Sequence, residues 1–207
     1  MARILCLFAI LFITQLHATT LLVYGDSLSA GYQLATGQSW PALLQQRWQK
    51  EAPELQLINA SISGETTQGG LERLPQALSH HKPDAVLIEL GANDGLRGLS
   101  PELTRQNLEQ MVTQIHQAGA KPLLMQIRLP RNYGPRYIKQ FEAIYPQLAQ
   151  QQKIPLLPFL LEPLVGQPEL FLPDGIHPNA QGQQQLVKQL SPLLTNEILS
   201  AKKPPKM

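Results

Sequence analysis

Residues 21–27 read Leu21-Leu22-Val23-Tyr24-Gly25-Asp26-Ser27, a short apolar run followed by a glycine and two polar residues. An apolar run of this length, bounded by a turn residue, is typical of a buried strand, and Gly25 permits a sharp turn directly after it. The pattern predicts that Ser27 lies at the carboxyl edge of a sheet, at or near the start of a helix. An isolated Gly-Asp-Ser is also explained by an N-capping serine, so the interpretation needs support from the rest of the chain.

Strand-like and helix-like segments alternate along the chain. Residues 84–90 are almost continuously apolar, as expected of a parallel strand that is covered on both faces. Five such alternations predict a three-layer α/β/α fold, built on a parallel sheet with right-handed crossovers. Strand patterns occupy residues 21–24, 55–59, 84–90, 122–127 and 154–158, and helical patterns lie within residues 40–48, 100–115, 137–148 and 186–194.

The composition is that of an ordinary globular protein. Of 207 residues, 43% are hydrophobic and 15% are charged, and the formal net charge is +2. A net charge so close to zero gives no indication of a nucleic-acid partner. We find no internal repeat and no inter-domain linker. The sequence therefore predicts one domain at residues 19–199, followed by a disordered basic tail at residues 200–207.

The first 18 residues have the pattern of a secretory signal peptide. Arg3 precedes an apolar stretch at residues 4–13, and the small residue Ala18 ends the segment. The stretch is shorter than the ~20 apolar residues that a membrane span needs. We expect cleavage after Ala18, a periplasmic location and no stable membrane insertion afterwards. The single cysteine, Cys6, lies in this segment, so the mature chain is expected to lack disulfides and thiolate chemistry.

Polar segments follow several of the predicted strands. Residues 25–27, 63–65 and 91–94 come after the first three, and residues 174–177 lie between the fifth strand and the last helix. Right-handed crossovers place the carboxyl ends of parallel strands at one edge of the sheet. We therefore expect these four segments to converge there.

Convergence would bring together the groups that acyl transfer requires. Ser27 would be the nucleophile, His177 its general base and Asp174 the carboxylate that orients the imidazole. An oxyanion needs donors that are fixed beforehand, and the candidates are the backbone N–H groups of Ser27 and Gly64 and the side-chain amide of Asn93. Gly64 lets the backbone approach a substrate without an intervening Cβ, and the amide of Asn93 supplies two N–H donors.

Each of these residues also has a purely structural explanation. Asn93 and Asp94 could be turn residues that bond their own backbone, Gly64 could serve only a positive φ, and lone histidines are usually structural. The joint functional interpretation is favoured because the four segments fit one reaction in order and topology. We interpret the remaining histidines of the predicted domain as helix-surface or helix-end residues; they are His80, His81 and His116.

The four segments resemble the sequence blocks of the SGNH, or GDSL-type, hydrolase family. The blocks are Gly25-Asp26-Ser27-Leu28-Ser29, Gly64, Gly91-Ala92-Asn93-Asp94 and the pair Asp174 and His177. Residues 93–98 and 125–134, with Pro178 after the last block, are similar to one subgroup of that family. The resemblance covers essentially the whole predicted mature chain.

The resemblance implies a flavodoxin-like sheet of five parallel strands. It also implies a triad of Ser27, Asp174 and His177, and an oxyanion hole made by Ser27, Gly64 and Asn93. For the subgroup it implies a serine esterase that cleaves acyl-CoA thioesters, lysophospholipids and aryl esters through an acyl-serine intermediate. Ala92 stands where the family pattern has Gly or Thr, which bears on the shape of the pocket. The chain carries no His-Glu-x-x-His, phosphate-binding loop or dinucleotide fingerprint, so we expect neither metal nor cofactor.

An apolar loop is predicted directly after Asn93. Residues 95–99 carry two leucines with glycines at both hinge points, and we expect this loop to close over an acyl chain and exclude water. Its structural alternative is a surface loop with two exposed leucines. The candidate substrate-binding residues are Leu96, Leu99, Ile127, Leu129 and Tyr133.

Two other functions stay open from the sequence. One is an esterase of the same fold that removes acetyl groups from carbohydrates, and the other is a non-catalytic envelope protein that binds lipid. For the favoured hydrolase we expect a small-molecule acyl ester or thioester as the partner, no nucleic acid and a monomeric chain.

Overall fold

The computed structural model describes residues 18–201. Residues 1–17, which hold Cys6 and nearly all of the predicted signal peptide, lie outside this range, as do residues 202–207. The last helix, α8 (Ala180–Ala201), continues two residues past the predicted domain end, so the first two residues of the predicted tail are helical. Ile198 in its last turns is fully buried, which explains why the helix extends this far.

Five parallel strands form one sheet in the order β2-β1-β3-β4-β5. This confirms the predicted five-stranded parallel sheet, and the order is that of flavodoxin-like folds. The fifth strand is shorter than the predicted residues 154–158, because Pro155 and Pro158 flank it and have no N–H for the ladder. The strands are β1 (Thr19–Gly25), β2 (Leu55–Asn59), β3 (Ala85–Glu89), β4 (Lys121–Met125) and β5 (Leu156–Leu157).

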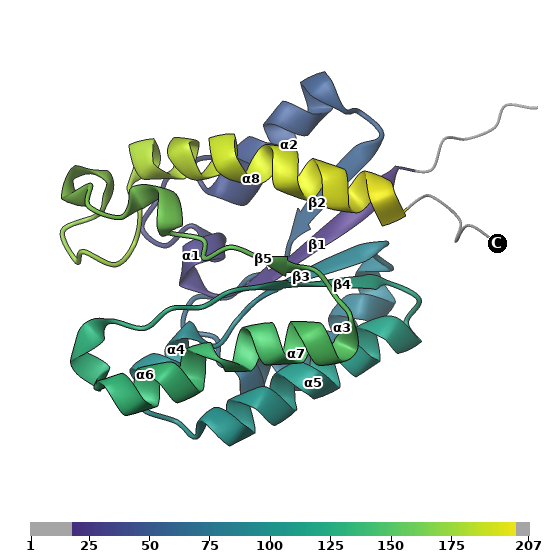
Figure 1. The fold of residues 1–207 in the computed structure, drawn as a ribbon. Helices are drawn as coiled ribbons and strands as arrows, with labels where there is room; N and C mark the ends of the chain where they lie inside the picture. Colours follow the sequence, from purple (N-terminus) through teal and green to yellow (C-terminus); the bar gives the residue numbers. More distant parts are fainter. Residues whose placement is uncertain (1–17, 202–207) are drawn as a thin grey trace, which may run out of the picture.

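Apolar cores lie on both faces of the sheet. Leu21 and Val23 of β1 pack in one core and Leu22 and Tyr24 in the other, because successive side chains of a strand point to opposite faces. Figure 1 shows α2 (Trp40–Glu51) and α8 over one face and α3 (Thr67–His81), α5 (Pro101–Gln117) and α7 (Ile144–Gln152) over the other, which confirms the three-layer architecture. Burial of each large apolar side chain contributes about 1.5–3 kcal/mol, so both helical layers are needed to stabilise the sheet.

The remaining helices complete the two outer layers and the loops at one end of the sheet. Most are preceded by a turn or cap that the sequence signals, such as Ser100, whose hydroxyl accepts from the N–H of Leu103 at the start of α5. The helices are α1 (Ser27–Ala30), α2 (Trp40–Glu51), α3 (Thr67–His81), α4 (Ala92–Leu96), α5 (Pro101–Gln117), α6 (Pro135–Glu142) and α7 (Ile144–Gln152), with 3₁₀ turns η1 (Arg131–Tyr133), η2 (Glu162–Leu164) and η3 (Pro168–Leu170).

The single helix predicted across residues 137–148 is two helices, α6 and α7, separated at Ala143. Pro146 explains the break, because it has no N–H to donate to the carbonyl of Glu142 one turn earlier. The side chain of Gln126 donates to that carbonyl instead, at 3.1 Å. A residue from the end of β4 thus takes over a backbone hydrogen bond that a continuous helix would have made.

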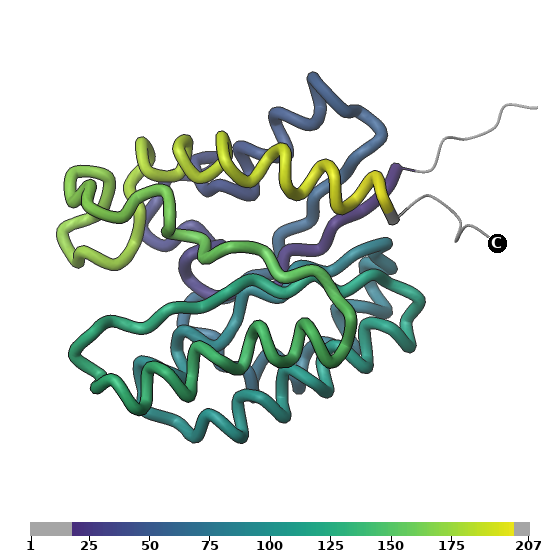
Figure 2. The backbone as a smooth tube through the Cα atoms, viewed as in Figure 1, coloured from purple at the N-terminus to yellow at the C-terminus, as the bar shows by residue number. Residues whose placement is uncertain are grey.

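The strand order also fixes where a site can form. Crossovers from β1 and β3 lead to opposite faces of the sheet, which leaves a crevice beyond the carboxyl ends of these two strands. Gly25 and Glu89, their last residues, lie side by side in the strand register. The turn after β1 and the segment before α8 reach the same end of the molecule (Figure 2), where Ser27 and His177 are in contact.

Candidate active site

The turn after β1 places Ser27 as the first residue of α1, and Asp26 is the N-cap. The carboxylate of Asp26 accepts from the N–H of Leu28 at 3.0 Å, so Asp26, rather than Ser27, caps the helix. A Cβ on Gly25 would lie 2.5 Å from the carboxyl of Glu89, which explains the glycine at this point. The tight turn therefore leaves the hydroxyl of Ser27 free for other partners.

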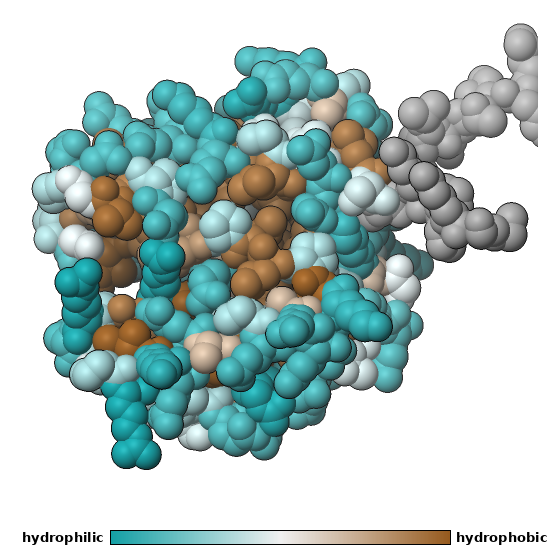
Figure 3. All heavy atoms as spheres, in the orientation of Figure 1, coloured by the Kyte–Doolittle hydropathy of each residue, from teal (hydrophilic) through white to brown (hydrophobic). Residues whose placement is uncertain are grey.

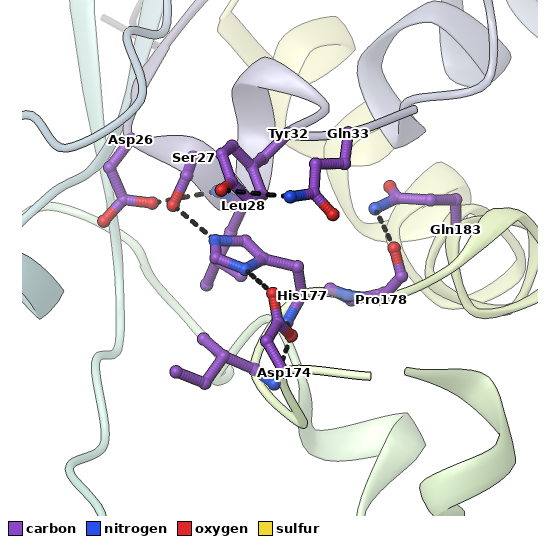
Figure 4. Close-up of polar contacts among 10 residues, drawn as sticks. Asp26, Ser27, Leu28, Tyr32, Gln33, Asp174, His177, Pro178 and Gln183 are labelled. Carbon is purple, nitrogen blue, oxygen red and sulfur yellow. Dashed lines mark hydrogen bonds and ion pairs between the residues drawn. The ribbon is translucent and has the colours of Figure 1, made fainter. Parts of the chain in front are cut away.

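Ser27, His177 and Asp174 form one hydrogen-bonded chain (Figure 4). The Nε2 atom of His177 lies 2.8 Å from Oγ of Ser27, and its Nδ1 atom lies 2.8 Å from Oδ2 of Asp174. An ionised carboxylate can only accept, so Nδ1 carries the proton and Nε2 accepts from the Ser27 hydroxyl. Folding thus brings together two residues 150 positions apart in the sequence.

Asp174 is held by more than the imidazole. Its Oδ1 accepts from the backbone N–H groups of Ile176 at 2.9 Å and His177 at 3.0 Å. Partial burial alone would raise the pKa of this carboxyl, but these two N–H groups and the side chain of His177 lower the pKa overall. The carboxylate is therefore ionised and already placed to accept a hydrogen bond from Nδ1–H of His177.

Asn93 lies in α4, immediately beyond β3, and its amide reaches toward the turn after β1. The Nδ2 group donates to the carboxylate of Asp26 at 3.2 Å and to the carbonyl of Glu65 at 3.0 Å. Gly64 precedes Glu65 and has φ of +80°, a conformation that favours glycine. The N–H of Ile62 donates to the carbonyl of Gly25 at 3.0 Å, so the segment around Gly64 is fastened beside the end of β1.

Asp94 is not the turn residue that the sequence offered as an alternative. It lies within α4, is almost fully buried, and its carboxylate accepts from the N–H of Thr67 at 2.9 Å and from the hydroxyl of Thr104 at 3.4 Å. These bonds join α4 to the start of α3 and to α5. Because Asn93 and Asp94 are adjacent in one helical turn, the bonds of Asp94 also limit the movement of Asn93.

Comparison with known proteins agrees with this arrangement. Residues 23–185 match the model of the GDSL-like Lipase/Acylhydrolase family. The chain belongs to this family. The family prediction made from the four sequence blocks is thus confirmed.

Two relatives and one solved structure illustrate the similarity. The chain is 50% identical over 184 residues to thioesterase 1/protease 1/lysophospholipase L1 of Escherichia coli K12, covering 87% of each chain. It is 50% identical over 178 residues to an arylesterase of Vibrio mimicus, covering 82% of this chain and 89% of the relative. The crystal structure of the psychrotrophic esterase EstA from Pseudoalteromonas sp., inhibited by monoethylphosphonate, superposes with a TM-score of 0.85 at 39% identity, covering 87% of this chain and 99% of EstA.

Two buried carboxyl groups, those of Asp26 and Glu89, lie near the turn that carries Ser27, and the sequence analysis gave neither a role. Burial raises the pKa of Asp26 from 3.8 to about 6, against the opposing effects of the Leu28 N–H and the nearby His177. Burial also raises the pKa of Glu89 well above its usual range, and the charge of Asp26 adds to this effect. An acid inside the otherwise apolar run at residues 85–90 was the available sequence signal for Glu89.

Tyr32 is a second feature that the sequence analysis missed. Its ring packs against the imidazole of His177, with centroids 4.5 Å apart and ring planes 39° from parallel. The hydroxyl of Tyr32 accepts from the side chain of Gln33 at 3.1 Å. This ring covers one face of the imidazole, so the mobility of His177 is limited from the α1 side as well as by Asp174.

An apolar cavity of about 300 Å³ adjoins the turn that carries Ser27. Figure 3 shows apolar side chains gathered around a hollow at this end of the molecule. The lining is almost entirely hydrophobic, and Leu28, next to Ser27, forms part of it. The other lining residues are Ala92, Leu96, Ile127, Arg128, Leu129, Pro130, Phe159, Leu161, Val165, Phe171, Gly175 and Ile176.

Three of the five predicted substrate-binding residues line this cavity, namely Leu96, Ile127 and Leu129. Leu99 and Tyr133 are not among the residues that line it. Leu99 is exposed, and its carbonyl accepts from the hydroxyl of Tyr137 at 2.7 Å. Tyr133 donates its hydroxyl to the carbonyl of Leu96 at 2.9 Å, so it fastens the backbone of this segment rather than facing the cavity.

The segment predicted to be a lid, residues 95–99, begins inside a helix. Gly95 is a residue of α4, and a Cβ there would lie 2.4 Å from the side chain of Leu129. Only Gly98 has the positive φ, +66°, expected of a turn glycine. Arg97 adds a further tie by donating to the carbonyl of Gly64 at 3.1 Å. The segment is therefore packed and bonded against its neighbours.

A larger groove of about 660 Å³ lies between the starts of α5, α6 and α7. Charged side chains such as Arg105, Arg136 and Lys139 line it, and it contains none of the predicted site residues. Size alone would favour this groove, but an acyl chain requires an apolar lining next to the reacting group. The smaller cavity beside Ser27 has such a lining and is the candidate site.

Proposed function

We propose that Ser27, His177 and Asp174 are the catalytic triad of this serine acyl hydrolase. The Ser27 oxygen attacks the carbonyl carbon of the substrate while Nε2 of His177 takes the hydroxyl proton. The imidazolium then gives this proton to the departing alcohol or thiol, which leaves an acyl group on Ser27. A water molecule, deprotonated by the same Nε2 atom, attacks the acyl-serine and releases the carboxylic acid.

The observation that carries this proposal is the pair of 2.8 Å contacts on the two ring nitrogens of His177. One contact provides a proton acceptor at the Ser27 hydroxyl. The other stabilises the imidazolium that forms when the proton arrives. Both contacts are made by side chains of the protein itself, so the reaction requires little reorganisation of the protein.

We further propose that the backbone N–H groups of Ser27 and Gly64 and the amide of Asn93 receive the oxyanion. The fixed positions of the three groups support this, since preorganised donors stabilise the charge that develops in the transition state. Asn93 already uses both N–H bonds, of which the one to Asp26 is longer, at 3.2 Å. We expect a substrate oxyanion to take the place of Asp26 in this bond.

For the substrate we propose fatty acyl esters and thioesters, with the acyl chain in the cavity next to Leu28. The hydrophobic lining supports an acyl chain, and the relatives named thioesterase, lysophospholipase and arylesterase support a choice of leaving groups. A panel of aryl esters, acyl-CoA thioesters and lysophospholipids with increasing chain length tests this. We expect kcat/KM to rise beyond acetyl, whereas a carbohydrate O-acetyl esterase would be most active on acetyl groups.

Two tryptophan variants locate the acyl chain. Leu96→Trp places a large ring in the cavity lining, so we expect the preferred chain to become shorter by several carbons. Leu99→Trp adds the same ring to an exposed position three residues away, and its chain-length profile should match the unmodified protein. Equal profiles for both variants would place the acyl chain elsewhere.

A serine-directed fluorophosphonate tests the alternative of a non-catalytic lipid-binding protein. We expect the probe to label the unmodified protein, and Ser27→Ala to abolish the labelling. If the protein only binds lipid, the probe should label neither the unmodified protein nor Ser27→Ala above background. The two proteins should bind fatty acid equally, because Leu28 and the other lining residues are unchanged.

We also propose that residues 1–18 direct export to the periplasm and that the mature protein acts there as a monomer. The basic start and short apolar stretch of this segment support the proposal. Among residues 18–201, the structure contains no helix that meets the length and hydrophobicity of a bilayer span. N-terminal sequencing of the protein from a periplasmic fraction should begin at Thr19, and light scattering should give the mass of one chain.

A further inference from the structure

Gln183, in the first turns of α8, is a buried polar side chain that the proposed reaction does not use. It is 2% exposed. Its Oε1 atom accepts from the backbone N–H of Trp40, at the start of α2, at 2.8 Å. Its Nε2 group donates to the carbonyl of Pro178 at 3.3 Å. Both ends of one amide are therefore paired, and one of the two partners is the residue that follows His177.

A second set of bonds continues from Trp40 to the turn that carries Ser27. The indole Nε1 of Trp40 donates to the hydroxyl of Ser29 at 3.2 Å, and this hydroxyl donates to the carboxyl of Glu89 at 2.7 Å. Trp40, Ser29 and Glu89 are all inaccessible to solvent. A continuous buried chain thus leads from the end of β3, past α1, to the loop of His177.

This chain lies beside the contact on which the proposed reaction depends. Figure 4 shows Gln183 bonded to Pro178 directly next to His177. The other backbone bonds around His177 lie within the loop, among them the N–H of Leu172 donating to the carbonyl of His177 at 2.8 Å and the N–H of Asn179 donating to the carbonyl of Leu170 at 2.8 Å. Gln183 instead joins Pro178 to Trp40 of α2. Loops at the surface are more mobile than the elements they join, and misplacing a reacting group by 1 Å can lower the rate about 10²-fold.

We propose that Gln183 is a positioning residue for acyl transfer: by joining Trp40 to Pro178, it holds the imidazole of His177 in register with the hydroxyl of Ser27. This inference rests on the proposed function. It goes beyond the triad and the oxyanion donors, because Gln183 touches neither substrate nor reacting atoms.

The alternative is that Gln183 only joins two helices. The chain offers a matched control, since the indole of Trp48 in α2 donates to the hydroxyl of Thr195 in α8 at 2.9 Å. This second bond connects the same two helices, but its α8 partner lies 12 positions after Gln183 and bonds no residue of the site. Loss of either bond should lower stability, whereas only Gln183 should affect the reaction.

The experiment compares Gln183→Met, which keeps the length and loses both hydrogen bonds, with Thr195→Val. For both variants kcat, KM and the rate of fluorophosphonate labelling are measured with the mature protein, together with the melting temperature. We expect Gln183→Met to lower kcat and the labelling rate at least tenfold with KM within twofold. We expect Thr195→Val to lower the melting temperature but leave kcat within twofold.

Gln183→Asn serves if Gln183→Met does not fold, because it keeps an amide but is one methylene too short to reach both partners. The inference is overturned if kcat stays within threefold, if KM rather than kcat changes, if Thr195→Val loses as much activity, or if neither Gln183 variant folds. The outcome is separate from that of the proposed function, which fails if the unmodified protein shows no Ser27-dependent hydrolysis.

Discussion

The two halves of the site contain aspartates in opposite environments. Asp26, in the turn after β1, is 1% exposed and is paired with Leu28 and Asn93. Asp174, in the loop before α8, has a side chain that is 33% exposed and accepts two backbone N–H groups and the imidazole of His177. Burial raises the pKa of Asp26 to about 6, whereas hydrogen bonds outweigh burial and lower the pKa of Asp174.

The difference shows that the charge of a carboxyl is set by its donors and its solvation rather than by its distance from the reaction. Asp174 keeps access to water and has three donors, so it stays ionised and can stabilise an imidazolium. Asp26 has lost its water and is better suited to holding the turn and Asn93 in place. We therefore expect variants of the two regions to differ in which property they lose, activity or the pH dependence of stability.

The largest effect is expected from removing the nucleophile in the buried turn. Ser27→Ala should lower kcat on the order of 10⁶-fold, as loss of a triad serine does, because the hydroxyl bonded to Nε2 of His177 is that of Ser27. The melting temperature should change by only a few degrees, since Asp26 rather than Ser27 caps α1. A variant that keeps more than a few per cent of the hydrolysis would show that Ser27 does not carry the acyl group.

The exposed loop is tested by Asp174→Asn. The amide places a donor opposite Nδ1 of His177 and favours the wrong tautomer, so kcat should fall roughly 10⁴-fold with little change in KM. Glu169→Gln, which removes a carboxylate from the same segment without altering the bonds to His177, is the control and should retain full activity. If Asp174→Asn and Glu169→Gln have the same activity, Asp174 has no special role in the reaction and its contrast with Asp26 is unfounded.

A smaller effect is expected at the point where the buried turn meets α4. Asn93→Ala removes one proposed oxyanion donor, which typically lowers kcat about 10²–10³-fold. It also removes the bonds to Asp26 and Glu65, so its stability must be measured alongside activity. A loss of less than tenfold in kcat, with the fold retained, would make Asn93 a structural residue only.

The smallest effect concerns stability and distinguishes the two aspartates directly. The folded state binds the proton of Asp26 more tightly than the unfolded chain does, since its pKa rises from 3.8 to about 6. The free energy of unfolding should therefore fall by roughly 2 kcal/mol as pH rises from 4 to 6, in addition to a change of the same sign from Glu89. Urea titrations across this range should show a smaller decrease in Asp26→Asn.

Asp174 provides the comparison for this measurement, because the sign is reversed. Its pKa is lowered in the folded state, so its contribution to stability is present above pH 4 and is lost only at lower pH. Asp174→Asn should leave the slope between pH 4 and 6 unchanged. Identical slopes in Asp26→Asn and the unmodified protein would show that burial does not control the titration of Asp26.

Much of the fold was predictable because local patterns report burial directly. The apolar run at residues 84–90 can be stable only between two covering layers, and it is the central strand β3. The break between α6 and α7 at Ala143 was harder to predict from the sequence. Pro146 lies in the third position of α7, where the sequence pattern is still helical, and the carbonyl it leaves free is satisfied by Gln126 from another element.

The sequence by itself determined which residues meet at the site. Polar segments that carry Ser27, Asn93 and His177 follow predicted strands, and parallel strands end at one edge of the sheet. Only the tertiary structure decided what surrounds them. The ionisation of Asp26 and Glu89, the ring of Tyr32 on His177 and the two bonds of Gln183 depend on burial and on partners distant in the chain. Solvation and long-range pairing are properties of packed side chains, and no local pattern records them.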